Sequence, residues 1–338
     1  MGAVNYSLAG IREDCREGRM PMHHLWGLEA LEEAGIDVAV LGSPQYLWLD
    51  LVTSITRHRF GDLNREMTLA SASRQSRADV VVCAETSFAK GLGLLRRLRI
   101  LRTPLVGVLH PYAPQQRWVR YCLGGFDHMI CLTRQTERDA RPWFPNDRLS
   151  RAGMGPDIGW PGYQSRDLGR VVSTGRTHRD LRLLADASEQ ARVPLTLHDP
   201  PHLPPSANRA DKSKAPYGEV MRDLCEAAVV AIPLSRTDGC FGITELNDAL
   251  ALGKPILMTR NANIDVDIEQ IGCGRWVDPG DLSGWTDGLR ELMSDPHLRH
   301  SMGERGREYA QREWNHRSFG DHLVKVVFSV GERSVSSG

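Results

Sequence analysis

The fold is decided by one stretch of the sequence, TDGCFGITELNDALALGKPILMTR, which spans residues 237–260. A loop of mostly small residues leads into an apolar run of helical length, which ends at Gly253. The segment KPILMTR that follows has the composition of a buried strand. A helix that stops at a glycine and passes directly into a strand is one unit of an α/β sheet. The stretch therefore predicts an α/β fold.

Similar apolar runs occur on both sides of this stretch. Each is bounded by Gly, Pro or Asp and is separated from the next by enough residues for a crossover helix, which is typical of a parallel sheet covered on both faces. The predicted strands of the first half are residues 36–42, 78–85, 103–110 and 126–133, and those of the second half are residues 169–175, 193–199, 227–235, 254–260 and 272–280. The pattern predicts two parallel sheets.

Other segments predict a helix, a hinge and a loop. Residues 23–35 have apolar side chains at helical spacing and end in Gly35, so we expect one helix before the first strand. A stretch rich in Pro and Gly between the two halves predicts a hinge near residues 155–168. Residues 200–218 are polar and rich in proline and are expected to form a loop. A length of 338 residues favours two domains.

Composition limits the classes of partner and compartment. Lys plus Arg and Asp plus Glu both total 42, which argues against a nucleic-acid partner. The seven cysteines form no CxxC pair, which favours a reducing compartment and gives no metal cage. The sequence shows neither a signal-peptide pattern nor an apolar run of ~18 residues, so we expect a cytoplasmic protein without integral membrane association.

The start of the helix in the deciding stretch is a candidate anion site. Gly242, Ile243 and Thr244 open this helix, where backbone N–H groups and the positive end of the helix dipole attract negative charge. Gly242 has no side chain to keep a phosphate away, so a pyrophosphate would fit. The alternative is an ordinary helix start in which Thr244 satisfies only its own first turn.

The deciding stretch and residues 272–314 resemble the donor half of retaining family-four glycosyltransferases, the group 1 type of GT-B fold. The resemblance covers residues 169–325, and the matching motifs are residues 248–255 and 279–281. The first half is similar to the acceptor domain of this family only through its strand order, the segment LVGVLHP and the segment MGPDIGWP.

This resemblance implies two Rossmann-like, doubly wound parallel-sheet domains facing each other across a cleft. Residues 1–160 would form the acceptor domain, together with a C-terminal helix, 314–330, that crosses back onto it. Residues 161–313 would form the donor domain. The implied reaction is that of a retaining hexosyltransferase, which moves a sugar from a UDP- or GDP-linked donor to a small-molecule or glycan acceptor without a metal or other cofactor.

Two arginines follow the first strand of the second half in the segment STGRTHRDL. The resemblance implies that Arg176 and Arg179 reach the donor diphosphate, where guanidinium groups would stabilise charge on the leaving group. The alternative is a solvated pair of arginines at a helix start.

The acidic residues depart from the family pattern of two glutamates eight positions apart. The second position falls on Asp248, which is implied to hydrogen-bond the nucleotide ribose, but the first falls on Cys240. A shift in the loop would let Asp238 take the place of the first glutamate, which contacts the donor sugar. Glu245 is another candidate for donor binding, with a structural role in the first turn as its alternative.

The first half offers candidates for the acceptor side. His110 ends a predicted strand at the carboxyl edge, where open α/β sheets bind ligands, so it could contact the donor sugar or position the acceptor hydroxyl. A structural histidine is the alternative. Gly18, Arg19, His23 and His24 lie where the family has a glycine-rich acceptor loop, although only Gly18 of that pattern is present.

Three other functions stay open at this stage. A catalytically silent GT-B partner subunit is favoured by the missing first glutamate, and a GT-B epimerase or hydrolase of the same donor would keep the diphosphate site. An NAD-dependent oxidoreductase is disfavoured, because the segment GLG at residues 91–93 is not completed to GxGxxG. The segment IDVDIE at residues 264–269 is expected to be structural, not a metal site.

Overall fold

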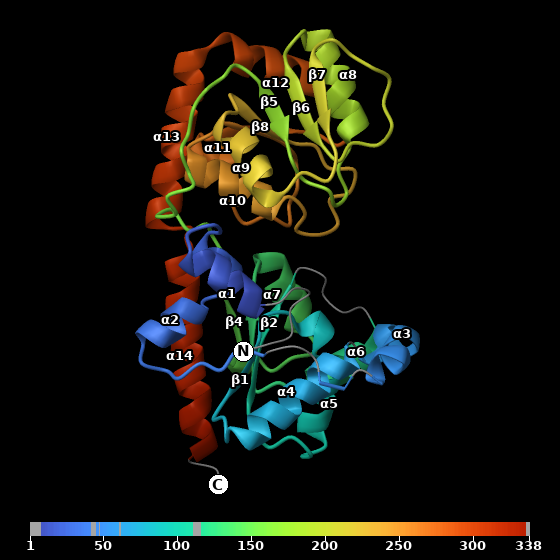
Figure 1. Cartoon of the computed structure of the whole chain (residues 1–338), viewed down its shortest axis with the longest axis vertical. Coiled ribbons are helices and arrows are strands. Elements are labelled where there is room, and N and C mark those ends of the chain that lie inside the picture. The colour runs from blue at the N-terminus through green and yellow to red at the C-terminus, as the bar shows by residue number, and fades with distance from the viewer. Residues whose placement is uncertain (1–7, 42–44, 47, 61, 111–115, 336–338) are drawn as a thin grey trace. The chain divides into compact units, whose positions relative to one another are not determined.

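The structure is a computed structural model that describes residues 8–41, 45–46, 48–60, 62–110 and 116–335, without the side chains of residues 56–60, 334 and 335. The chain divides into two compact units (Figure 1). The first unit contains Met1–Met154 and His316–Gly338, and the second contains Gly155–Asn315.

The second unit contains a six-stranded parallel sheet in the order β10-β9-β8-β5-β6-β7. Its strands are β5 (Val171–Ser173), β6 (Leu195–His198), β7 (Arg209–Lys212), β8 (Val229–Ile232), β9 (Ile256–Thr259) and β10 (Gly274–Val277). The chain leaves β5 toward β6 and β7 and then returns to the other edge of β5 at β8. The order of the strands therefore reverses between β5 and β8, which makes this place the topological switch point of the sheet.

Helices cover both faces of this sheet, and neighbouring strand residues point to opposite sides. The helices of the unit are α8 (Leu181–Ala191), α9 (Tyr217–Cys225), α10 (Ile243–Leu252), α11 (Ile268–Ile271), α12 (Leu282–Ser294) and α13 (Pro296–Arg312). Val172 and Val230 belong to a core with α9 and α10, whereas Val171 and Val229 belong to a core with α8 and α12. This burial on both faces explains the unbroken apolar strand sequences.

The first unit contains a four-stranded parallel sheet in the order β1-β2-β3-β4. Its elements are β1 (Val81–Cys83), β2 (Leu105–Leu109), β3 (His128–Cys131), β4 (Leu149–Arg151), α1 (Leu8–Arg16), α2 (Leu28–Glu33), α3 (Leu49–Phe60), α4 (Leu63–Gln75), α5 (Lys90–Arg97), α6 (Arg117–Leu123), α7 (Arg134–Ala140), α14 (His316–Val335) and three short 3-10 helices, η1 (Met22–Leu25), η2 (Thr86–Phe88) and η3 (Asn146–Arg148).

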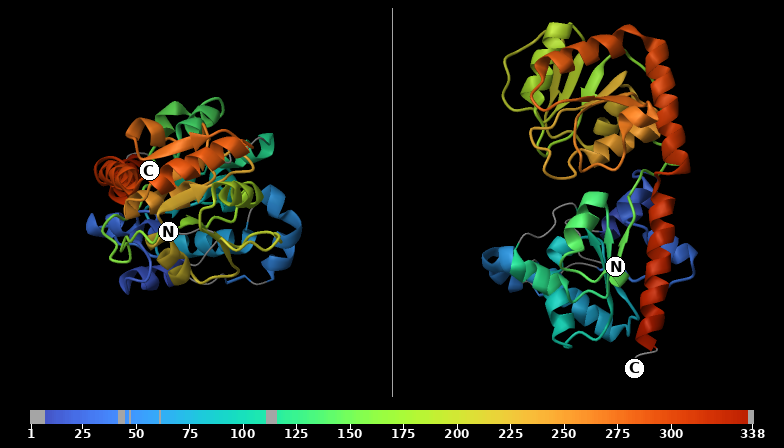
Figure 2. Two further views of the ribbon diagram at one scale, coloured as in Figure 1. Left: turned by 90° about the horizontal axis from the view of Figure 1, so that it is seen from above. Right: turned by 180° about the vertical axis from the view of Figure 1, so that it is seen from behind.

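The two faces of this sheet have separate cores. Val82 and Val106 pack with α1, α2 and α14, and Leu105 and Leu109 pack with α4, α5 and α6. In both side views, α14 and α3 lie on opposite sides of the unit (Figures 1 and 2). Among the described residues, no helix has both the length and the apolar character that crossing a bilayer requires.

The helix predicted over residues 23–35 is wrong as a single element. Trp26 and Gly27 have positive φ angles of 56° and 75° and separate η1 from α2. Gly27 lies against α14, because a Cβ atom placed on it would be 3.1 Å from Leu323 Cδ2 and 3.2 Å from Gly320 Cα. The close approach of a helix far along the chain therefore breaks a locally good helical pattern.

The predictions for residues 36–42 and 200–218 also need correction. No strand is assigned to residues 36–41, although Ile36, Val38 and Val40 pack on the core, and Gly42 lies outside the described residues. The predicted loop contains β7, which pairs with β6 at the edge of the sheet. The central residues of β7 are exposed, so it lacks the apolar pattern by which a strand is recognised.

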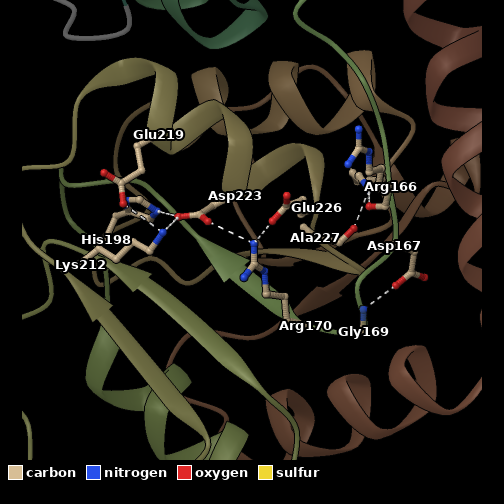
Figure 3. Close-up of polar contacts among 11 residues, drawn as sticks. Arg166, Asp167, Gly169, Arg170, His198, Lys212, Glu219, Asp223, Glu226 and Ala227 are labelled. Carbon is tan, nitrogen blue, oxygen red and sulfur yellow. Dashed lines mark hydrogen bonds and ion pairs between the residues drawn. The ribbon is translucent and has the colours of Figure 1, made fainter.

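A charged network joins the β5, β6 and β7 side of the sheet to α9 (Figure 3). The buried Asp223 carboxylate lies 2.9 Å from His198 Nε2 and accepts hydrogen bonds from Lys212 Nζ at 2.6 Å and Arg170 Nη2 at 3.1 Å. Lys254, from the motif matched to the family, is also buried and donates to the carbonyls of Arg166 and Ala227. These contacts make Lys254 a structural residue.

Close packing of α13 on the end of α10 predicts a specific stability effect. A Cβ atom on Gly303 would lie 1.9 Å from the Gly253 carbonyl oxygen, so Gly303→Ala should lower the free energy of unfolding by about 1–3 kcal/mol. Gly218→Ala is the matched control, because Gly218 is also helical but a Cβ there meets nothing within 4 Å. Urea unfolding of both variants tests this, and equal stability would contradict the packing described.

Candidate functional site

The loops that follow β5 and β8 meet at the switch point of the second unit. Residues 174–180 follow β5 and residues 233–242 follow β8. Arg179 forms an isolated antiparallel bridge with Leu234, and the Ser235 N–H donates to the His178 carbonyl at 2.8 Å. The two loops therefore form one joined surface at the carboxyl edge of the sheet, where ligands of open α/β folds bind.

A buried ion pair fixes the first loop to α10. Glu245 Oε2 accepts hydrogen bonds from Arg179 Nη2 at 2.7 Å and Nε at 3.1 Å. Its other oxygen accepts from the Gly175 N–H at 2.9 Å and the Thr174 hydroxyl at 3.0 Å. Both side chains are almost fully buried, with 7% of Arg179 and 3% of Glu245 exposed. The pair therefore ties the β5 loop to the first turn of α10.

Gly175 makes this ion pair possible. A Cβ atom at this position would lie 2.1 Å from Arg179 Nη2 and 2.2 Å from Nε, so the guanidinium rests directly on the glycine backbone. The third guanidinium nitrogen, Nη1, donates to the Thr177 carbonyl at 2.7 Å. Arg179 was predicted to reach a diphosphate, but in this arrangement its nitrogens already hold the loop and Glu245.

The two helices that begin at the switch point differ in their caps. The Asp180 side chain caps α8 and accepts from the Leu183 N–H at 3.1 Å. The N-cap of α10 is Gly242, which has φ of +89° and leaves the first turn without a side-chain cap. A Cβ on Gly242 would lie 2.8 Å from Ile232 Cγ2, so packing as well as φ requires glycine here.

The open start of α10 is accessible to solvent. Thr244 is exposed and Ile243 is half-buried. Backbone N–H groups at an uncapped helix start are donors for an anion, and the helix dipole adds a favourable potential. The geometry of this start is therefore the one expected of an anion-binding site.

Arg176 supplies an accessible positive charge on the same loop surface. Its side chain is 63% exposed, and Nε lies 2.5 Å from Asp199 Oδ2. The pKa of Asp199 is lowered, first by the hydrogen bond from the Lys214 N–H and also by the charge of Arg176. An exposed ion pair of this kind contributes little stability, so Arg176 can exchange its partner for an anionic ligand at small cost.

The loop before α10 is held from β9 and carries Cys240 and Asp238. The Asn261 side chain donates to the Gly239 carbonyl at 2.8 Å, and the Asn263 side chain donates to the Thr237 carbonyl at 2.7 Å. Burial raises the pKa of the Cys240 thiol to about 12, so this side chain is neutral. Asp238 is exposed and paired with Arg236.

Asp248 is enclosed beneath the helix start. Its Oδ1 accepts from the Tyr163 hydroxyl at 3.0 Å, and the side chain is buried. Burial raises the pKa of Asp248 to about 7, and the nearby Glu245 carboxylate acts in the same direction. The predicted ribose contact would require this carboxyl to exchange Tyr163 for the nucleotide.

His110 lies at the carboxyl end of β2 in the first unit. Its Nε2 is 2.9 Å from the Ala84 carbonyl oxygen, and its ring centroid is 4.8 Å from that of Trp26. Burial lowers the pKa of His110, so the imidazole is neutral near pH 7. With Nε2–H donating to Ala84, Nδ1 is the nitrogen that could accept a proton.

The other predicted acceptor-side residues lie around the turn between α1 and η1. Gly18 has φ of +72°, and Arg19 is paired with Asp14 and Glu17. The rings of His23 and His24 are 4.4 Å apart. Burial lowers the pKa of His23 well below its usual value and that of His24 to about 4, so both are neutral at pH 7.

Sequence reasoning missed several residues that build the site. Gly175 lies two residues after the end of a buried strand, which is a signal for a close approach of the backbone, whereas Asp199 and Tyr163 had no local signal. Their roles arise from contacts with Arg176 and Asp248 far along the chain. Within the described ranges, no three His, Cys, Asp or Glu side chains are grouped so that they could hold a metal ion.

Comparisons with known proteins agree with this architecture. No family model matches the chain. The D-inositol 3-phosphate glycosyltransferase of Corynebacterium jeikeium is 34% identical over 86 residues, which cover 25% of this chain and 20% of that protein. A GDP-mannose-dependent monoacylated alpha-(1-6)-phosphatidylinositol monomannoside mannosyltransferase of Corynebacterium glutamicum is 23% identical over 164 residues, 47% of this chain and 38% of that protein.

The solved structures show the fold. HepE of Anabaena, whose crystal structure contains UDP and glucose, matches with a TM-score of 0.62 at 13% identity over 89% of this chain and 88% of HepE. The chain therefore has the GT-B fold, and the predicted resemblance to group 1 glycosyltransferases is confirmed. The matched segments span less than two fifths of the two curated relatives' own lengths.

The buried ion pair predicts that Glu245 is a stability determinant. Glu245→Ala should lower the free energy of unfolding by about 3–5 kcal/mol, because it leaves the Arg179 charge buried without its partner. Asp238→Ala, which removes an exposed carboxylate, should change it by less than about 1 kcal/mol. Urea unfolding measures both. Similar losses in the two variants would show that the Glu245 pair has no special role.

The enclosed Asp248 predicts a pH-dependent stability. The unfolded chain releases this proton near its ordinary pKa of 3.8, but the folded chain releases it near 7. The stability that the neutral form contributes is therefore lost as the pH rises from about 4 to 7, on the order of 2–4 kcal/mol.

The variant Asp248→Asn removes this titration. The stability of the natural protein relative to the variant should fall between about pH 4 and pH 7, measured by urea unfolding at each pH. The histidines with lowered pKa values titrate in both proteins and cancel in the difference. A difference that does not change with pH would mean that Asp248 is ionised throughout.

Proposed function

We propose that this protein is a glycosyltransferase that binds a nucleoside-diphosphate sugar at the switch point of the second unit. The observation that carries the proposal is the uncapped start of α10 at Gly242, next to a loop surface that presents the exposed Arg176. The names of the two relatives, each matched over part of this chain, also support a glycosyltransferase.

The proposed role of this arrangement is to bind and stabilise the leaving diphosphate. The N–H groups of Ile243 and Thr244 donate to phosphate oxygens, and Arg176 exchanges Asp199 for the same anion. Arg179 and Glu245 act as positioning residues, because their ion pair holds the loop that carries Arg176. Charge that develops on the departing diphosphate is stabilised by these fixed donors, without a requirement for metal.

The proposed reaction proceeds with retention at the anomeric carbon. The acceptor hydroxyl attacks from the face that the diphosphate leaves, and a phosphate oxygen of the donor takes the proton. UDP and GDP are the proposed carriers: the name of one relative specifies GDP-mannose, and HepE was crystallised with UDP. The sugar transferred is a hexose.

The first unit is proposed to bind the acceptor, a small molecule or a glycan. His110 stands at the carboxyl edge of its sheet and is neutral, so its Nδ1 can accept a hydrogen bond from a sugar or acceptor hydroxyl. The turn that carries Gly18, Arg19, His23 and His24 is the proposed acceptor side of this unit.

A second candidate function is a catalytically silent binding subunit. It is favoured by Cys240 at the first acidic position of the family pattern, and by the engagement of Glu245 and Asp248 with protein partners. Such a subunit would keep the GT-B fold and bind a nucleotide weakly or not at all.

The first experiment measures thermal stabilisation of the purified protein by UDP, GDP, ADP, dTDP and NAD, with and without added divalent metal. One nucleoside diphosphate should raise the Tm without metal. Arg176→Ala should weaken its binding by about tenfold to a hundredfold, because a charge-assisted contact to phosphate is lost. Arg222→Ala, a change on α9, should leave binding unchanged.

The outcomes separate the candidate functions. No shift with any nucleotide would contradict the proposed transferase and favour the silent subunit. Binding followed by epimerised or hydrolysed donor, detected by product analysis, would indicate the related donor-processing reactions. A shift with NAD alone would overturn the proposal.

A further inference from the structure

The helix α3 presents apolar side chains to solvent. Trp48, directly before the helix, is 70% exposed, and Leu51 and Ile55 are 73% and 77% exposed. Their spacing of three and four residues places them on one side of the helix. The buried Leu49 is on the other side. A soluble helix normally buries its apolar side, so this one carries the opposite of the usual pattern.

A second exposed group of aromatic residues lies on α6, which α3 contacts. The rings of Trp118 and Tyr121 stack with centroids 5.8 Å apart, and both side chains are exposed. The Arg97 guanidinium at the end of α5 lies 4.2 Å from the centroid of the Tyr121 ring. Directly after Arg97, Leu98 is also exposed. Exposed apolar side chains therefore occur on α3, on α6 and directly after α5, and these three helices contact one another.

The chain around this area is strongly basic. Between Glu85 and Asp127 the sequence contains no acidic residue, but it contains seven basic ones, namely Lys90, Arg96, Arg97, Arg99, Arg102, Arg117 and Arg120. Over the whole chain the two charge types are equal in number, at 42 each. Arg97, Arg99, Arg102 and Arg117 are exposed. Positive charge is thus concentrated where α5 and α6 present apolar side chains.

We propose that this surface docks on an anionic lipid bilayer. It is formed by Trp48, Leu51, Ile55, Trp118 and Tyr121 with the exposed arginines Arg97, Arg99, Arg102 and Arg117. Aliphatic side chains enter the acyl boundary, where they need no hydrogen-bond partner. Trp and Tyr suit the interface, since one part of each ring is apolar and the other polar. The arginines bind lipid phosphates.

The charge distribution favours a membrane over a second copy of the chain. A two-fold dimer through this surface would place the same arginines opposite one another, and no acidic side chain between residues 85 and 127 would compensate them. An anionic bilayer supplies the opposite charge together with an apolar layer. In both side views, α3 stands on the outer side of its unit, away from α14 (Figures 1 and 2).

This inference goes beyond the proposed enzymatic activity and does not depend on it. Docking is measured by flotation of the full chain with vesicles of phosphatidylcholine alone, or of phosphatidylcholine mixed with phosphatidylglycerol. The protein should float with the mixed vesicles and much less with phosphatidylcholine alone. Binding should weaken as the salt concentration rises, because the electrostatic part is screened.

Two sets of variants separate the apolar and the charged contributions. The double variant L51Q/I55Q removes apolar contact without changing the charge. It should lower vesicle binding by about tenfold or more, because two aliphatic side chains no longer leave water for the bilayer. The triple variant R99Q/R102Q/R117Q should lower it on the order of a hundredfold, because each arginine near an anionic surface contributes about a factor of five.

The matched control is L168Q/F328Q. These side chains are also apolar and exposed, but they lie on the second unit and on α14, so vesicle binding should not change. The Tm of each variant shows whether it is folded. Failure of the natural protein to float with the mixed vesicles would overturn the proposal, as would equal binding by L51Q/I55Q and the natural protein. Dimerisation that L51Q/I55Q abolishes, without vesicle binding, would identify a second copy as the occupant.

Discussion

The ion pair between Glu245 and Arg179 is the interaction on which the second unit's site depends. It joins the loop after β5 to the first turn of α10 at the place where the strand order reverses. Two charges removed from water are stable only if their hydrogen-bonding groups are satisfied, and here Thr174 and Gly175 complete the carboxylate. The pair holds two loops from different strands in one fixed geometry, at the cost of desolvating both partners.

The same pair determines which charges remain available. Arg179 and Glu245 neutralise each other, and the exposed Arg236 is paired with Asp238. The groups of the loop surface that can attract an anion are therefore Arg176 and the uncapped start of α10. Both are positive in character. The Glu245 carboxylate in the first turn of α10 would otherwise repel a bound anion. Its ion pair with Arg179 neutralises this charge. The fold thus separates a structural ion pair from a neighbouring anion-binding surface.

The first unit separates its two sides in a comparable way. The α14 side is sealed by apolar packing on α1, α2 and the sheet, and a glycine on each partner allows close contact between α2 and α14. The α3 side instead leaves aliphatic and aromatic groups outside, among arginines. Such a surface is costly in water and becomes favourable when an apolar, anionic layer covers it.

Local patterns in the sequence determined most of the α/β units, since a helix, a strand and a glycine stop depend on residues close along the chain. The open helix start at Gly242 is also local. Contacts between distant residues were decided only by the tertiary structure: Arg179 meets Glu245 across 66 positions, and Tyr163 meets Asp248 across 85. The break at Gly27 and the polar edge strand β7 have the same origin. Periodicity records which face of an element is apolar, but the partner of a charge depends on which segments the fold brings together.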